Sequence, residues 1–215
     1  MSDEKWKIGV AASWHPHPPP AASLLPPASC LLSFTINHSP FTIYPMIGRP
    51  EPNEAAPYYS TYTDLVSSDN VLEAIESQLE ETLSFLSSVS EEQSLHRYAP
   101  EKWSLRELVN HVNDAERVFL FRALWFARGF PDPLPSFDQD IGVAGSSADQ
   151  VSWAQHLEEF RSIRLATINF FRNLPTEGWM RSGIASDNPF TVRALAYIIA
   201  GHLAHHVAVI RERYF

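Results

Sequence analysis

Residues 103–129, WSLRELVNHVNDAERVFLFRALWFARG, predict a long helix and define both of its ends. Ser104 and Glu107 have the spacing of a capping box, in which each side chain binds the backbone N–H of the other residue. Gly129, followed closely by Pro131, is a typical helix stop. Between these ends the apolar repeat places five residues on one face, namely Leu108, His111, Ala115, Val118 and Arg122.

A second stretch, residues 191–213 with the sequence TVRALAYIIAGHLAHHVAVIRER, predicts a helix that begins near Thr191. Residues four apart lie on the same face of a helix, so His202 and His206 can present two imidazoles to one point. His205 is three residues from His202 and could in principle replace His206, but it lies about 100° to one side of the apolar stripe. That stripe consists of Leu195, Ile199, His202, His206 and Val209.

Two further helices complete the predicted fold. One begins near Asn70, with Glu73 at the capping-box position, and another runs from about Ser147, with Gln150 as its box partner, to Asn173. Residues 130–147 are expected to form a long loop, and no strand-like alternation is visible after residue 67. The fold class is therefore an all-α four-helix bundle.

The N-terminal segment differs from the rest of the chain. The first 57 residues hold 11 of the 17 prolines, and residues 1–45 contain only four charged side chains. Proline at this density prevents helix and disrupts sheet ladders, so we expect residues 1–45 to be a disordered extension, or a segment foreign to the fold with Met46 as the true start. Residues 46–215 then form the bundle domain, in which 46–66 are an irregular lead-in whose tyrosines, Tyr58, Tyr59 and Tyr62, pack on the helices.

Composition argues against several classes of protein. The net charge of −9 and pI near 5.4 argue against nucleic-acid binding, which needs a basic face. The single cysteine, Cys30, excludes an internal disulfide and a cysteine-based zinc site. The apolar run Ile8–Ala12 is too short for a secretory signal, and Leu195–Ala200 is too short to span a bilayer, so we expect a cytoplasmic protein without membrane contact.

The three histidines of the two stripes, His111, His202 and His206, form a candidate metal site. A histidine on an apolar face is often only a core residue bonded to a carbonyl, but burying three imidazoles without partners costs roughly 1–3 kcal/mol each. One metal ion satisfies all three, and three protein nitrogens with an open position are typical of a catalytic site. Asp114, one turn after His111, is either a partner of that ligand or a surface charge. His205 is expected at the rim of the site or in a subunit contact, and no carboxylate is evident as a fourth ligand or general base.

Two segments resemble the DinB-like, YfiT-like family of metal-dependent enzymes: residues 103–116, WSLRELVNHVNDAE, and residues 201–207, GHLAHHV. The family pattern has a Trp-Ser helix start leading to a first histidine, with an aspartate three residues on, and a late helix bearing H-x-x-H-H. The resemblance covers about residues 46–215 and extends to the run FDQD at 137–140. It implies a four-helix bundle in which His111, His202 and His206 bind Zn²⁺ or Ni²⁺, commonly as a homodimer. Characterised relatives include S-transferases and isomerases that use low-molecular-weight thiols.

Two functional hypotheses follow. The first is a metal-dependent enzyme acting on a small molecule, either by transferring a low-molecular-weight thiol to an electrophile or by hydrolysis at the same site. The second is a stress-associated binding or scaffold protein whose metal is structural or vestigial. An open coordination position lined by polar groups favours the enzyme, whereas a fourth protein ligand favours the scaffold.

Overall fold

Four long helices make up most of the structure, and each begins at a side-chain cap. We describe residues 47–215 of a computed structural model of the chain. The oxygen of each capping side chain accepts a hydrogen bond from the backbone N–H three residues on, which satisfies a donor that the helix leaves free. The caps and helices are Asn70 before α2 (Val71–Leu86), Ser104 before α3 (Leu105–Ala127), Ser152 before α5 (Trp153–Arg172) and Thr191 before α6 (Val192–Arg213).

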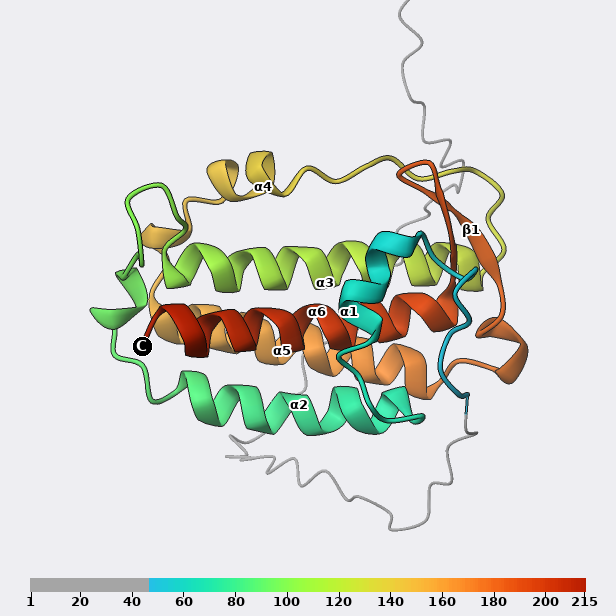
Figure 1. Cartoon of the computed structure of the whole chain (residues 1–215), viewed down its shortest axis with the longest axis horizontal. Helices are drawn as coiled ribbons and strands as arrows, with labels where there is room; N and C mark the ends of the chain where they lie inside the picture. Colours follow the sequence, from blue (N-terminus) through green and yellow to red (C-terminus); the bar gives the residue numbers. More distant parts are fainter. Residues whose placement is uncertain (1–46) are drawn as a thin grey trace, which may run out of the picture. The chain divides into compact units, whose positions relative to one another are not determined.

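The long helices form a bundle in which α3 and α2 each pack against both α5 and α6. Consecutive helices α2 and α3 therefore lie across the bundle from each other. α3 runs antiparallel to α6 and parallel to α5 (Figure 1). The Tyr214 hydroxyl, just past α6, donates to Trp103 O, just before α3, at 2.8 Å. The predicted all-α four-helix bundle is confirmed, with a connectivity that needs a long return segment between α3 and α5.

α6 is the central helix of the core. Seven consecutive residues, Ala194 to Ala200, are each at most 2% exposed, because α2, α3 and α1 (Ser60–Thr63) all pack against this helix. By length and composition α6 could cross a membrane, so the apolar stretch is longer than the sequence led us to expect. However, 61% of its most apolar 18-residue segment is buried inside the protein. Apolar residues all round a helix are what a buried core position requires.

Several short elements join the long helices. They are η1 (Pro57–Tyr59), η2 (Gln93–Leu95), α4 (Gln139–Ser146), η3 (Ala148–Gln150), η4 (Thr176–Gly178) and the strands β1 (Ser182–Ala185) and β2 (Asn188–Thr191). The strands pair antiparallel through the two-residue turn Ser186-Asp187, in which both residues have positive φ, as in a type I′ hairpin. The expectation of no strand after residue 67 was therefore wrong. Each strand has only four residues, and one contains Gly183 and the other Pro189. Such short segments show too little alternation and too low a β propensity to be recognised as strands in the sequence.

The start of α5 and the structure of the loop before it also differ from the prediction. Ser147 has a left-handed φ of 53° and ends α4, so the expected start of α5 at Ser147 was wrong. The capping box of Ser152 and Gln155 starts the helix instead. The preceding loop was expected to be irregular, but the Asp138 carboxylate accepts from Asp140 N and Ile141 N and caps α4 inside it.

The lead-in packs directly on α6. Glu54 Oε2 accepts a hydrogen bond from the Thr191 hydroxyl at 2.6 Å and another from Arg193 Nε at 3.0 Å, which holds the lead-in at the start of α6. Further along, the backbone of Tyr62 crosses α6 at Gly201, where an added Cβ would lie 2.0 Å from Tyr62 O. Only glycine allows this approach, so Gly201 is what lets α1 lie beside His202. The expectation for residues 1–45 lies outside the described residues.

We predict that Gly201→Ala destabilises the protein by about 1–3 kcal/mol, because the new Cβ overlaps a backbone oxygen that no side-chain rotation can move. Urea unfolding of the full chain measures the change. Gly145→Ala in α4 is the matched control, since a Cβ there meets no atom within 4 Å. Equal stability of the two variants would contradict the close approach of α1 to α6.

Candidate metal centre

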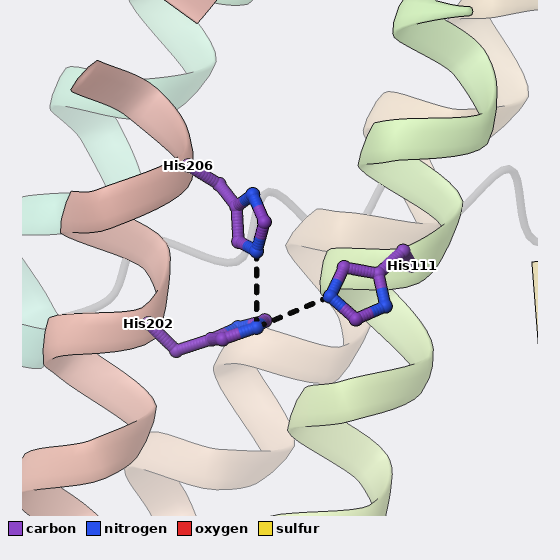
Figure 2. Close-up of side chains that lie close together, drawn as sticks. All are labelled: His111, His202 and His206. Carbon is purple, nitrogen blue, oxygen red and sulfur yellow. Dashed lines mark hydrogen bonds between the residues drawn. The ribbon is translucent and has the colours of Figure 1, made fainter. Parts of the chain in front are cut away.

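Three imidazoles from two helices meet in the bundle core. His111 lies on α3, and His202 and His206 lie one turn apart on α6, with their rings pointing toward one another (Figure 2). His202 Nε2 is 3.2 Å from His111 Nε2 and 3.1 Å from His206 Nε2. One nitrogen from each ring falls in a group whose members are all within 4.8 Å of one another.

The helices and the aromatic residues around the site hold the three rings in place. The antiparallel packing of α3 on α6 brings the two predicted stripes face to face. The Trp103 ring lies against His111 with centroids 5.0 Å apart, while Tyr62 and Phe119 meet His202 edge-on at 5.3 and 5.8 Å. His111 and His202 are 4% and 5% exposed, so two of the rings are removed from water and the third is partly buried.

Burial keeps the three imidazoles neutral at physiological pH. Desolvation lowers the pKa of His111 to about 4, partly opposed by the negative charge of Asp140. Desolvation also lowers the pKa of His206 to about 3, and the neighbouring His111 and His205 add to the effect. The pKa of His202 is well below its ordinary value for the same reason, with His206 as the largest charged contributor. Neutral imidazole is the form that ligates a metal.

The donor set fits a divalent cation better than it fits a hydrogen-bonded cluster. The contacts of His202 Nε2 with His111 and with His206 share one nitrogen, which carries either one proton or one lone pair, so only one of the two can be a well-aligned hydrogen bond. A tetrahedral ion at roughly 2.0–2.1 Å from each nitrogen would hold two ligand nitrogens about 3.3 Å apart. The nitrogens of His111 and His206 lie 3.2 and 3.1 Å from that of His202, and all three lie within 4.8 Å of one another. The ion would occupy all three Nε2 lone pairs and leave the Nδ1 atoms protonated. The Nδ1 atoms of His111 and His206 are buried and have no hydrogen-bond partner among residues 47–215.

The two flanking candidates behave differently from the three histidines. His205 stays outside the cluster and packs edge-on against Tyr62 at 5.7 Å and His206 at 5.0 Å. Asp114 is not in hydrogen-bond contact with His111; it accepts from Asn110 Nδ2 at 2.9 Å and from Arg117 Nη1 at 3.2 Å. Among residues 47–215, the hydrogen-bond partners of the Asp114 carboxylate are therefore neighbours on α3, and His111 is not one of them.

Two cavities adjoin the histidines. The first, about 300 Å³, is lined by His111 and His202 together with residues of the lead-in, of α3 and of the segment before α4, including Tyr59, Tyr62 and Arg122. The second, about 370 Å³, is lined by His205 and His206 with Trp103, Lys102 and Asp140. The three-histidine group therefore has open space next to it on two sides, and each space is large enough for a small molecule.

Asp140 is the site residue that sequence reasoning missed. It lies in the first turn of α4, lines the second cavity, and its charge acts on His111. Its position depends on the Asp138 cap and on the path of the return segment between α3 and α5, which periodicity does not describe. The only available signal was the likeness of residues 137–140 to a loop of the family.

Three histidines that converge from α3 and α6 in the core of a four-helix bundle define a class of bundle proteins with a candidate metal centre, and the family of the chain follows from its similarity to known proteins. The family model of the DinB superfamily matches residues 74–210, so the chain belongs to the DinB superfamily. Among solved structures it is similar to YfiT from Bacillus subtilis, with 17% identity and a TM-score of 0.59 over 67% of this chain and 83% of that one. YfiT is described as a probable metal-dependent hydrolase with an unusual four-helix bundle topology. No curated protein matches the sequence.

We predict that the metal-free protein loses stability as the pH falls from about 6.5 toward 4. Unfolded histidines bind protons near pH 6.5, whereas the folded pKa values of His111 and His206 are about 4 and 3, so protonation favours the unfolded chain across this window. Urea unfolding with chelator present, at pH 7.5 and pH 5, measures the loss. His206→Gln should reduce the difference between the two pH values, and an unchanged difference would contradict the burial of a neutral imidazole there.

Proposed function

We propose that this protein is a metal-dependent enzyme in which His111, His202 and His206 bind one divalent cation, Zn²⁺ or Ni²⁺. One observation carries the proposal: within residues 47–215 no fourth histidine, cysteine or carboxylate joins the group of three. Three protein ligands leave a coordination position for water or substrate, as catalytic sites do, whereas structural sites are closed by a fourth. Open space beside the histidines on two sides supports the same conclusion.

A divalent cation held there would supply a nucleophile at neutral pH by lowering the pKa of a coordinated water or thiol. The protein's own residues provide the rest. The aromatic rings of Trp103, Phe119 and Tyr62 limit water around the imidazoles. The Asp140 carboxylate, on the cavity beside His206, is the acidic group placed to accept the proton that the nucleophile gives up.

Two reaction types use this arrangement. Hydrolysis needs one organic substrate, and the description of YfiT as a probable metal-dependent hydrolase supports it. Transfer of a low-molecular-weight thiol needs two substrates, and the presence of separate cavities on the His202 side and the His206 side supports it. We favour thiol transfer because each cavity can hold one partner with its reacting atom at the metal. A cytoplasmic homodimer is part of this proposal, and a non-catalytic scaffold with a closed metal site is the alternative.

His206→Ala should lose both metal and activity, whereas His205→Ala should keep its metal, because only the first variant removes one of the three ligand nitrogens. Loss of residues that merely support ligands costs about 10–100-fold in metal affinity, so loss of a ligand should cost more. The measurements are metal content after dialysis and a thiol-conjugation and ester-hydrolysis screen, each with and without chelator. Circular dichroism should show an intact fold in both variants.

Asp140→Asn, tested in the same assays, should keep the metal and lower the rate. Stoichiometric metal in a variant with all three histidines changed to alanine would contradict the site. Activity that survives exhaustive chelation of the wild type would contradict the enzyme mechanism while leaving metal binding intact.

A further inference from the structure

Arg122 is an unusual buried charge. Three arginines in residues 47–215 are at most 4% exposed, and two of them have a carboxylate partner. Arg106 pairs with Glu91, and Arg164 Nη2 lies 2.9 Å from Glu116 Oε2 as an ion pair without hydrogen-bond alignment. Within the described residues no acidic side chain lies within 4.0 Å of Arg122. A guanidinium keeps its charge in proteins, so burial without an anion is unfavourable for Arg122.

The groups that do surround Arg122 are uncharged. Its Nη2 donates to Pro135 O at 3.2 Å and to the Ser186 hydroxyl at 2.9 Å. The Tyr59 phenol also interacts with it, but burial raises the pKa of Tyr59, so this hydroxyl stays protonated and does not neutralise the guanidinium. The Phe119 ring lies 5.9 Å from the guanidinium carbon and contributes only a weak attraction. The positive charge is therefore balanced by no group on the described chain.

Arg122 faces the same cavity as the candidate metal centre. His111, Ala115, Val118 and Arg122 follow one another along one face of α3, and all four line the cavity of about 300 Å³. His111 and Arg122 are eleven residues apart, which is about 16 Å along the helix axis. The Arg122 side chain points back over the Phe119 ring toward the histidines, because side chains on a helix tilt toward its N-terminus. The small side chain of Ala115 leaves room between them. Aromatic rings supply most of the remaining wall, namely those of Tyr58, Tyr59, Tyr62, Phe119 and Phe137.

We propose that Arg122 binds the carboxylate of a small organic acid whose apolar or aromatic body lies between these rings and whose other end reaches the three histidines. A planar guanidinium binds a carboxylate through two parallel hydrogen bonds, and aromatic walls suit a flat apolar body. The acid would be the electrophilic or hydrolysable substrate of the proposed enzyme, so its role in catalysis rests on the proposed function. The binding of its carboxylate to Arg122 is independent of that function.

Calorimetric titration of the full chain with benzoate and with benzamide tests this subsite. Both probes have the same ring, but only benzoate is charged. The chelated, metal-free protein is used first, because a carboxylate could also bind a metal ion. We expect benzoate to bind more tightly than benzamide, and Arg122→Met to weaken benzoate by about tenfold or more with little effect on benzamide. Loss of structure around Arg122 would instead weaken both probes equally, and that result would overturn the proposal.

Ser186→Ala is the matched control, because it removes a hydrogen-bond partner of Arg122 and keeps the charge. It should keep the preference for benzoate. Inorganic phosphate is the third probe: binding as tight as that of benzoate would overturn the aromatic part of the subsite. No benzoate binding to the metal-free wild type would overturn the whole proposal, even if the metal content and activity assays support the enzyme. Conversely, a benzoate preference that depends on Arg122 in a protein unable to retain metal would leave the subsite standing and remove the proposed catalysis.

Discussion

The antiparallel contact between α3 and α6 is the constraint on which the rest of the structure depends. It brings His111 within 3.2 Å of His202, and it places Arg122 and the rings around the site along the same seam. The remaining helices support this contact: α5 buries the far side of α3, and α2 buries α6. Burial of the seam also removes the imidazoles from water, which keeps them neutral and lowers the pKa of His111 to about 4.

The elements around this contact explain why the site is reached from two sides. The lead-in crosses α6 at Gly201 and forms the wall of the first cavity with Tyr59 and Tyr62. The return segment between α3 and α5 exists because these helices are parallel, and it brings Asp140 to the second cavity. Connections that look like simple linkers in the sequence thus supply the residues that would meet a substrate. This division is common in enzymes, where a rigid scaffold holds loops that carry function.

The sequence predicted the bundle because its local signals agree with the fold. The caps at Asn70 and Ser104 and the apolar stripe after Thr191 predicted three helix starts. The stripe on α6 placed His206, and not His205, on the same face as His202. The same reasoning failed where two signals competed. Ser147 and Ser152 both precede a glutamine at the capping-box spacing, and only tertiary packing selects Ser152: the Trp153 indole, next to it, donates to Leu86 O at 3.1 Å. Arg122 was visible on the His111 face, but its missing carboxylate partner depends on segments far apart in the chain.

X-ray absorption spectroscopy of the full chain loaded with one equivalent of Zn²⁺ tests the metal site most directly. Three imidazole nitrogens converge without a fourth protein ligand in the described residues, so the spectrum should fit three imidazoles at roughly 2.0–2.1 Å and one light, exchangeable ligand. Added thiol should replace that light ligand with sulfur at about 2.3 Å. A spectrum with fewer than three imidazoles, or with four protein ligands and no response to thiol, would contradict an open three-histidine centre.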